Sequence, residues 1–391
     1  MLETEKRNII LTDKKYSLLF RGVEMNIDNE HLHNMLMPKD CDTNRFSDKR
    51  VAYFKEFGFK VSSIYSEIYP IYNGIESDRY LPASLYYYYI TPFLCNLNFM
   101  EAYVDKNIYH FLFPDVKQPS TIVRCINGRY YTSNLQELSL EDAISALSSH
   151  YSFIIKPSLE TGGGNGVSKI KKHDSQDWKL TINSTIKAYG DNWIAQVQVK
   201  NSKEMATFNA SSLNTMRIYT FRTTNRPTNQ QTYVELGSTL RFGGKGMDVD
   251  NACSGGGFMA IDKEGNLSER VWRYADFKPY TTNDFGFKPF KLSKFAEAKE
   301  LCLKLHSRLP YFDLIGWDIA VDDNDELILI EFNRTPDCEH FQIAHGPMFG
   351  EYLDDLLDKV KDNTTEFTVV AERSFKDGKQ LSSHYFDFTR L

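Results

Sequence analysis

A lysine and four glycines lie close together in the segment KPSLETGGGNGVSKI, residues 156–170. Lys156 ends an apolar, β-branched stretch, and the glycines follow it within ten residues. Backbone N–H groups in such a loop can approach phosphate oxygens, because glycine has no Cβ in the way. On an extended strand Lys156 shares a face with Ile154, so its charge needs an anion or solvent. Together the lysine and the loop predict a clamp for a polyphosphate.

The glycine segment matches neither of the common nucleotide-binding motifs. The Walker A pattern GxxxxGK[ST] is absent from the chain, and Lys169 stands where GxGxxG needs its third glycine. A plain flexible hairpin loop is the alternative interpretation of the glycines alone. The lysine on the preceding strand is what favours the phosphate clamp.

Oxygen-bearing side chains form a second candidate group in GWDIAVDDNDELILIEFN, residues 316–333. The pattern predicts a strand, a turn and a second strand. A turn at Asn324–Asp325 places Asp318 directly opposite Glu331, with Asn333 on the same face. Facing carboxylates repel each other, so the pair needs a proton or a metal ion between its members. Mg²⁺ binds one or two carboxylates together with phosphate oxygens, so we expect magnesium here. The alternative is that Asp318 points to solvent beside the turn.

Length and composition limit the elements that can position these groups. The 391 residues, 41% of them hydrophobic, suffice for two or three subdomains. A net charge of −6 argues against a nucleic-acid partner. Six cysteines without a CxxC pair favour reduced thiols, and we expect a cytoplasmic protein. Residues 85–97 are too few and too tyrosine-rich for a transmembrane segment, and no signal peptide is recognisable.

Hydrophobic periodicity predicts a mixture of helices and strands and an α+β fold class with largely antiparallel sheets. Residues 1 to about 105 are expected to hold mostly helices and loops. Amphipathic helices are expected at 139–150, 294–309 and 349–362. Strands are expected at 151–157, 193–199, 215–223, 232–242 and 257–262, besides the hairpin at 316–333.

The order and spacing of these motifs resemble the ATP-grasp superfamily, and most closely the sugar-transfer-associated branch found among polysaccharide biosynthesis genes. The motifs are KPSLETGGGNGV at 156–167, AQVQV at 195–199, SLNTMRIYT at 212–220, DNACSGGG at 250–257, IGWDIAV at 315–321 and IEFNRTPD at 330–337. The resemblance implies an ATP-grasp fold, in which two α+β subdomains bind ATP between them. We expect the small subdomain at 106–200 and the large one at 201–363. An N-terminal region, 1–105, with possible acceptor binding, and a C-terminal tail, 364–391, would flank them.

The resemblance also implies which residues bind the nucleotide. Lys156 would bind the α- and β-phosphates, and an upstream basic residue, either Lys106 or Arg124, would complete the clamp. The remaining candidates are the flap glycines Gly163, Gly164 and Gly166, the adenine-hinge residues Gln196 and Val199, and Glu204 for the ribose hydroxyls. Gln196 departs from the glutamate that many ATP-grasp enzymes carry there.

Catalytic roles follow from the same resemblance. Asp318, Glu331 and Asn333 would bind Mg²⁺, and Arg217 would face the transferred phosphate and the acyl intermediate. Lys156 would assist Arg217 in offsetting the repulsion between the reacting anions. Cys253, in the glycine-rich segment 243–257, is a spectator thiol, because no histidine near it in the sequence can activate it.

The implied activity is an ATP-dependent carboxylate–amine ligase that forms a C–N bond through an acylphosphate. Its partners would be a small-molecule or glycan-precursor carboxylate, such as a uronic acid, and an amino acid or other amine. Two alternatives stay open: a kinase that phosphorylates a glycan hydroxyl, and a non-catalytic nucleotide-binding scaffold. The sequence leaves the acceptor and the oligomeric state undetermined.

Overall fold

The computed structural model describes most of the chain, in sixteen stretches of which the longest is 279–362. They are residues 14–20, 23–27, 48–59, 64–82, 85–96, 99, 102–103, 105–159, 166–173, 177–225, 228, 230–244, 256–273, 279–362, 367–376 and 379–386. The chain divides into two compact units, one of Glu101–Asp337 and one of Met1–Met100 with Cys338–Leu391. The finer boundaries expected at 105, 200 and 363 stay a prediction.

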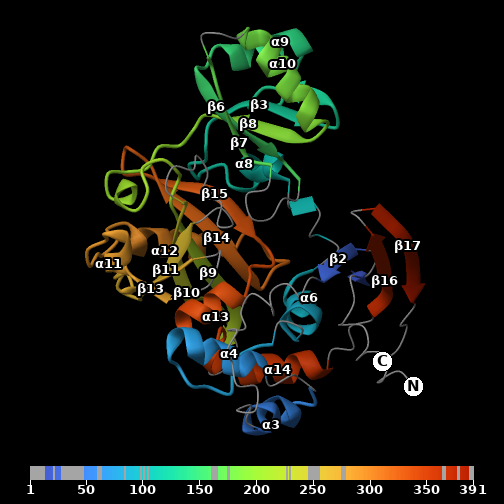
Figure 1. Cartoon of the computed structure of the whole chain (residues 1–391), viewed down its shortest axis with the longest axis vertical. Coiled ribbons are helices and arrows are strands. Elements are labelled where there is room, and N and C mark those ends of the chain that lie inside the picture. The colour runs from blue at the N-terminus through green and yellow to red at the C-terminus, as the bar shows by residue number, and fades with distance from the viewer. Residues whose placement is uncertain are drawn as a thin grey trace. The chain divides into compact units, whose positions relative to one another are not determined.

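A six-stranded sheet and two helices form the first part of the Glu101–Asp337 unit. The strands are β3 (Thr121–Ile126), β4 (Arg129–Tyr131), β5 (Glu137–Leu138), β6 (Ser152–Pro157), β7 (Ser168–Lys171) and β8 (Trp193–Gln196), in the order β5-β4-β3-β8-β6-β7. The helices α9 (Leu140–Ser148) and α10 (Trp178–Tyr189) lie together on one face of the sheet (Figure 1). Ser139 caps α9, and Asp177 caps α10. Phe153, Ile155 and Trp193 are fully buried between sheet and helices.

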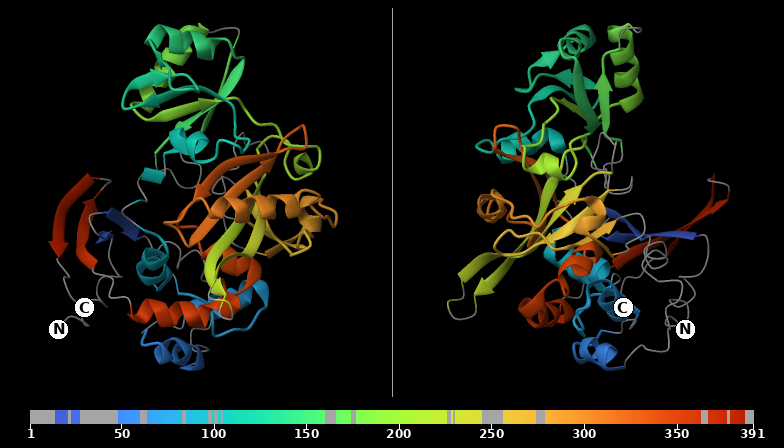
Figure 2. Two further views of the ribbon diagram at one scale, coloured as in Figure 1. Left: turned by 180° about the vertical axis from the view of Figure 1, so that it is seen from behind. Right: turned by 60° about the vertical axis from the view of Figure 1, so that its left-hand side comes forward.

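A seven-stranded sheet forms the second part of the same unit. Its strands are β9 (Thr215–Asn225), β10 (Gln230–Phe242), β11 (Gly257–Ile261), β12 (Arg270–Arg273), β13 (Pro279–Thr281), β14 (Leu314–Val321) and β15 (Leu327–Asn333), in the order β13-β12-β11-β10-β9-β14-β15. The short helix α11 (Thr282–Phe285) follows β13, and α12 (Phe295–His306) packs on β9, β10 and β14. The pair β9–β10 runs on past its neighbours as a two-stranded ribbon (Figure 2).

Two short helices, η3 (Lys106–Ile108) and α8 (Tyr109–Leu112), precede β3, and a third, η5 (Met205–Thr207), lies between β8 and β9. Every helix and strand predicted from residue 139 onwards is present, with ends shifted by a few residues. All strand pairings among the described residues are antiparallel, which confirms the α+β class with antiparallel sheets.

The other unit combines helices with a four-stranded sheet. The helices are α3 (Asp48–Glu56), α4 (Ile64–Asn73), η2 (Tyr86–Ile90), α6 (Thr91–Leu94), α13 (Glu339–His345), η7 (Gly350–Tyr352) and α14 (Leu353–Asp362). The strands are β1 (Lys14–Phe20), β2 (Val23–Ile27), β16 (Phe367–Lys376) and β17 (Lys379–Phe386), in the order β17-β16-β1-β2. Before residue 105 the expectation was mostly helices and loops, and the described residues there form four helices and the two strands β1 and β2. The C-terminal tail pairs with β1 through β16.

Gln342 joins the N-terminal and C-terminal segments of this unit. Its side chain is fully buried, accepts a hydrogen bond from Leu81 N–H at 2.8 Å and donates one to the Leu81 carbonyl at 3.0 Å. Its own carbonyl accepts from Asn73 Nδ2 at 2.8 Å. Leu85, Tyr86 and Ile90 are also buried, so the tyrosine-rich segment contributes to a core.

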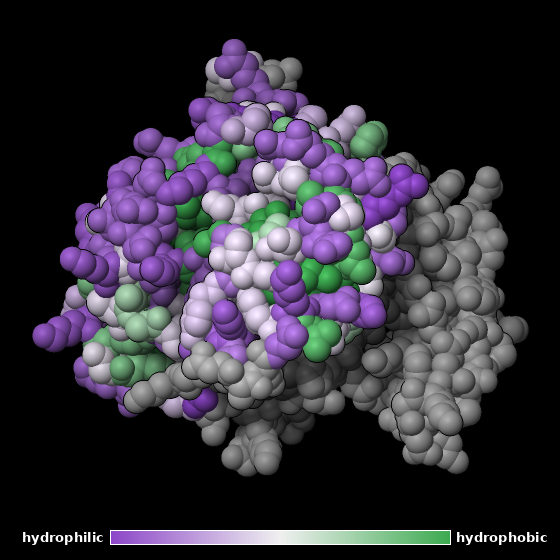
Figure 3. Space-filling view, turned by 90° about the horizontal axis from the view of Figure 1, so that it is seen from above, coloured by the Kyte–Doolittle hydropathy of each residue, from purple (hydrophilic) through white to green (hydrophobic). Residues whose placement is uncertain are grey.

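No helix in the described part of the chain is long and apolar enough to cross a bilayer. The face shown in Figure 3 is mostly hydrophilic, with hydrophobic side chains in separate patches.

Candidate active site

Two basic side chains lie in one row across the six-stranded sheet. Ile194 on β8 pairs with Arg124 on β3 and with Lys156 on β6. Directly opposed residues in antiparallel strands point to the same face. The flanking residues Ile155 and Ala195 are fully buried on the face that α9 and α10 cover, so the two cations point to the other face.

Arg124 is almost completely buried, with 3% of its surface exposed. Its Nη1 donates to the Asn107 carbonyl at 2.7 Å, and Nη2 lies 3.0 Å from His110 Nδ1. Its Nε has no hydrogen-bond partner among the described residues. Burial lowers the pKa of Arg124 to about 10, although the negative charge of Asp105 acts in the opposite direction. Burial and Arg124 likewise lower the pKa of His110. A buried guanidinium whose Nε has no hydrogen-bond partner among the described residues is suited to binding an anion.

Lys106 lies elsewhere, beside the carboxylates. Its backbone N–H donates to the Ser158 carbonyl at 2.9 Å, and its Nζ is 3.7 Å from Glu331 Oε2. Of the two basic residues between which the sequence could not choose, Arg124 therefore shares the row of Lys156. Lys106 pairs with a predicted metal ligand.

Of the flap glycines, Gly163 and Gly164 lie outside the described residues, whereas Gly166 is described. Gly166 has φ of +75°, and a Cβ there would lie 2.9 Å from Pro157 Cγ. Both facts require glycine. Tyr189 donates to the Gly166 carbonyl at 2.7 Å. The end of the loop is thus fixed against the residue that follows Lys156.

The hinge candidates follow directly on β8. Gln196 is 8% exposed, lies two residues after Ile194 on the same face, and donates from Nε2 to the Pro119 carbonyl at 3.2 Å. Val199 is half-buried beyond the end of β8. Glu204 accepts a hydrogen bond from Ser293 N–H at 3.0 Å, which ties it to the segment before α12.

A second polar row crosses the seven-stranded sheet. Arg217 on β9 pairs with Thr239 on β10 and with Asp318 on β14, and Asp318 pairs in turn with Glu331 on β15. Asn333 is two residues beyond Glu331 and pairs with Gly316. The predicted pairing of Asp318 with Glu331 is confirmed.

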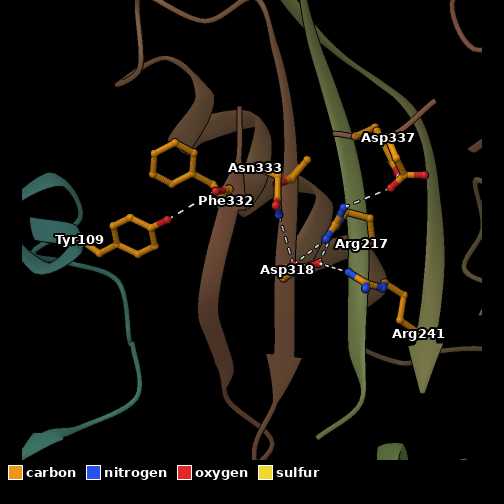
Figure 4. A network of polar contacts seen from close by, with 9 residues as sticks. Tyr109, Arg217, Arg241, Asp318, Phe332, Asn333 and Asp337 are labelled. Carbon is orange, nitrogen blue, oxygen red and sulfur yellow. Dashed lines mark hydrogen bonds and ion pairs between the residues drawn. The ribbon is translucent and has the colours of Figure 1, made fainter. Parts of the chain in front are cut away.

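Asp318 is the centre of the polar network in Figure 4. Arg217 Nε donates to Oδ1 at 2.6 Å and Nη2 donates to Oδ2 at 2.8 Å. Arg241 Nη1 is 3.5 Å from Oδ1, and Asn333 Nδ2 is 3.3 Å from Oδ2. Asp318 is 4% exposed, which excludes the alternative of an aspartate pointing to solvent beside the turn.

The charges around Asp318 decide its protonation. Burial alone would raise the pKa of Asp318. The positive charges of Arg217 and Arg241 lower the pKa by more than burial raises it, and a hydrogen bond with Glu331 lowers it further. The pKa of Asp318 is therefore held below its usual value. In return, Asp318 raises the pKa of Arg217 well above its usual value, although burial acts the other way. Asp318 is therefore ionised near neutral pH.

Phe332 lies between Glu331 and Asn333 on β15, and its packing holds this part of the strand in place. Tyr109 stacks on its ring at 5.1 Å between centroids and donates to its carbonyl at 3.4 Å. Phe332 is paired with the fully buried Trp317, on the face away from Asp318. This packing sets where the neighbouring polar side chains emerge.

The oxygens of Asp318, Glu331 and Asn333 fit a magnesium ion in chemical type. Mg²⁺ needs hard oxygen ligands and usually takes one or two carboxylates plus substrate phosphates. A carboxylate has about four lone-pair directions, of which Arg217 uses one on each Asp318 oxygen. The longer contacts from Arg241 at 3.5 Å and Asn333 at 3.3 Å take the other two, so a metal ion would replace one of these. No group of three His, Cys, Asp or Glu side chains suited to a metal occurs in the described ranges. Asp318 and Glu331 alone would therefore leave most of the coordination sphere of Mg²⁺ to other oxygen ligands.

Sequence reasoning missed two polar residues at this site, Arg241 and Asp337. Asp337 Oδ2 is 3.8 Å from Arg217 Nη1 and accepts from the Tyr219 hydroxyl at 3.4 Å. Strand alternation offered a signal for Arg241, because it is two residues beyond Thr239, the partner of Arg217. Asp337 ends the motif IEFNRTPD but had no assigned role. Cys253 lies outside the described residues.

Comparison with solved structures finds several distant neighbours. The biotin carboxylase domain of a Hydrogenobacter thermophilus 2-oxoglutarate carboxylase, with MgADP, ADP and bicarbonate, is 12% identical over 71% of this chain and 51% of that one, with a TM-score of 0.40. D-alanine–D-alanine ligase from Bacillus anthracis is 11% identical, covering 71% and 70%, with a TM-score of 0.35. N5-carboxyaminoimidazole synthetase from Staphylococcus aureus with ADP is 14% identical, covering 69% and 56%, with a TM-score of 0.36. The chain thus spans about half the length of the first neighbour.

With TM-scores below 0.5, these neighbours carry no argument about activity. No curated protein matches the chain. A family model does match it, over residues 98–356, a range that includes both polar rows. The chain has the ATP-grasp fold and belongs to the sugar-transfer associated ATP-grasp family.

Proposed function

We propose that this protein is an ATP-dependent carboxylate–amine ligase that acts through an acylphosphate. The observation that supports it best is the row Arg217–Asp318–Glu331, in which an arginine and two carboxylates share one face of a sheet. Such a row can hold a metal ion and a reacting anion side by side.

The row Arg124–Ile194–Lys156 would bind the phosphates of ATP. The two cations project from strands on either side of β8, so the sheet holds them in place before the nucleotide arrives. Gly163, Gly164 and Gly166 would cover the phosphates from the loop. Gln196 and Val199 would receive the adenine, and Glu204 the ribose.

Asp318, Glu331 and Asn333 would hold Mg²⁺, which when bound neutralises charge on the transferred phosphate. Lys106, whose Nζ is 3.7 Å from Glu331 Oε2, would hold that carboxylate in place. Arg217 would orient the substrate carboxylate and stabilise the charge that develops during transfer. Arg241 is a further cation on that face, and its Nη1 lies 3.5 Å from Asp318 Oδ1.

The reaction then has two steps. A carboxylate oxygen of the substrate attacks the γ-phosphorus of ATP, and the bond to the bridging oxygen breaks as ADP leaves. The amine next attacks the carbonyl carbon, a C–N bond forms, and phosphate leaves with the electron pair of the broken C–O bond. Arg217 would bind the oxyanion that forms before phosphate departs.

The sugar-transfer association of the family supports a glycan precursor as the acid, and we favour a uronic acid amidated by an amino acid or amine in capsule or exopolysaccharide synthesis. The reaction would take place in the cytoplasm, where ATP is available.

The fate of ATP tests the proposal. Uronic acids and amines are screened in pairs for ADP and free phosphate, with hydroxylamine as a general trap for acylphosphates. The proposal expects ADP and phosphate only when acid and nucleophile are both present, and none with Glu331→Gln. Phosphate retained on a sugar hydroxyl would instead identify a kinase. If no pair of acid and amine led to nucleotide turnover, the protein would be a non-catalytic nucleotide-binding scaffold.

A further inference from the structure

An amide-forming enzyme has to bind and deprotonate its amine. Near neutral pH an aliphatic amine carries a proton, and only its neutral form attacks a carbonyl carbon. As the C–N bond forms, the nitrogen becomes positive and must lose a second proton. A carboxylate beside the arginine that holds the acyl group would attract the ammonium form and accept that second proton. Asp318 and Glu331 are not suited to this, because both are assigned to the metal.

Asp337 is a further carboxylate on the guanidinium of Arg217. Arg217 uses Nε and Nη2 on Asp318, and its Nη1 lies 3.8 Å from Asp337 Oδ2 (Figure 4). The guanidinium thus has one carboxylate at each end. An acyl group bound to Arg217 would therefore lie next to Asp337.

The two carboxylates differ in access to solvent. The Asp318 side chain is 6% exposed, whereas that of Asp337 is 31% exposed. An amine arriving from solvent can reach Asp337 without displacing the ion pair between Arg217 and Asp318. This difference divides the site into a metal side and a nucleophile side.

The position of Asp337 is fixed by its neighbours. Its Oδ2 accepts from the hydroxyl of Tyr219, which is 1% exposed on β9. The preceding Pro336 packs on Gly316, where an added Cβ would be only 2.7 Å from Pro336 Cβ. A carboxylate held by a buried tyrosine and a proline has little freedom to move, as a catalytic group requires.

We propose that Asp337 binds the ammonium group of the acceptor amine and accepts a proton as the C–N bond forms. The inference rests on the proposed ligase function and adds to it a residue and a substrate class, a cationic amine. The ammonium first loses one proton to solvent. The neutral amine then attacks, Asp337 takes the second proton from nitrogen, and that proton passes to the departing phosphate.

The test uses two nucleophiles of similar size and different charge. D-Glucuronic acid, ATP and Mg²⁺ are supplied with either hydroxylamine, which is uncharged near neutral pH, or ammonium chloride. Hydroxylamine needs no cation site and reacts readily once an acylphosphate exists. Asp337→Asn should therefore keep hydroxamate formation within about twofold, but lose about 10²-fold in amide formation from ammonium. Asp337→Glu should recover part of the loss.

Asp313→Asn is the matched control. Asp313 is 29% exposed and pairs with Arg222 on the same strand, as Asp337 pairs with Arg217. The control should behave like the wild type with both nucleophiles. An equal fall with both nucleophiles in Asp337→Asn would show that Asp337 only supports Arg217, and unchanged rates would remove it from the site. If the wild type forms no hydroxamate, the ligase proposal itself fails, and this inference with it.

Discussion

Arg217 holds Asp318 in a fork of two hydrogen bonds, 2.6 Å from Nε to Oδ1 and 2.8 Å from Nη2 to Oδ2. Both side chains are more than nine-tenths buried. The sequence predicted a carboxylate pair strained by repulsion whenever metal is absent. The structure shows instead that arginines balance the charge of Asp318, so the metal-free protein carries less of that strain.

Replacing Arg217 by methionine should destabilise the protein near neutral pH by about 3–5 kcal/mol, because Asp318 is left buried without its main partner. Urea denaturation measures the change. Arg222→Met is the control, because its partially exposed pair with Asp313 should be worth only about 0–1 kcal/mol. A loss no larger than in the control would show that the buried pair is not what holds the two strands.

The same pair predicts how stability depends on pH. The pKa of Asp318 is lowered in the folded protein, so its contribution is complete above the unfolded value of about 3.9 and disappears as pH falls through the lower folded value. In Arg217→Met, burial would raise that pKa, and the variant should instead gain relative stability as pH falls from neutral. Urea midpoints measured at a series of pH values would refute this if both proteins gave the same profile.

Replacing Glu331 by glutamine should remove most of the stabilisation that Mg²⁺ and ATP give, and nearly all turnover. A ligand at a hundred times its Kd stabilises by about 2.7 kcal/mol, so the loss is measurable by thermal unfolding. The metal-free variant should be at least as stable as the wild type, since one of two neighbouring carboxylates is neutralised. Glu326→Gln, on the turn of the same hairpin, should keep the full response to Mg²⁺ and ATP.

Replacing Lys156 by alanine should weaken ATP binding by about 1.5–3 kcal/mol, or roughly 10- to 100-fold, without unfolding the protein. Calorimetric titration with ATP measures the effect. Lys171→Ala provides the control, because Lys171 is exposed on the edge strand β7 of the same sheet. An unchanged Kd in Lys156→Ala would make the lysine a structural residue.

Adding a methyl group at Gly316 should displace the neighbouring residues Pro336 and Arg217. The new Cβ would lie 2.7 Å from Pro336 Cβ and 3.3 Å from Arg217 Cδ, closer than packed carbons lie. Gly316→Ala should cost about 1–3 kcal/mol and lower activity by displacing Arg217 or Pro336. Gly286→Ala separates the two effects, because it strains the backbone at φ of +72° but has nothing within 4 Å of its Cβ. Equal activity in the two variants would contradict the expectation.

The β14–β15 hairpin was predicted only in part from the sequence. The pairing of Asp318 with Glu331 was predicted from a turn at Asn324–Asp325 and is observed. On the turn side, however, Val321 pairs with Leu327, so the turn is centred on Asn324 alone. A one-residue bulge at Ile330 restores the predicted pairing further along. Two departures thus cancelled, and neither has a local signal in the sequence.

Other features depended on contacts between distant segments. Periodicity located the strands of both polar rows, because alternation of buried and polar residues is a local property. It could not show that Arg124 and Lys156 face the same partner, since that depends on the order of strands in the sheet. The pairing of β16 with β1 joins the two ends of the chain, for which no nearby residue provides evidence.

The sheet also fixes the distance between Arg124 and Lys156. Adjacent strands lie about 4.8 Å apart, so two cations on either side of β8 are fixed roughly 10 Å apart at the backbone. Backbone hydrogen bonds between the strands keep that spacing. A single phosphate group cannot be close to both cations unless their side chains converge, whereas a chain of two or three phosphates can meet each of them. The sheet would therefore discriminate by the number of phosphates, and AMP would be bound far more weakly than ADP or ATP.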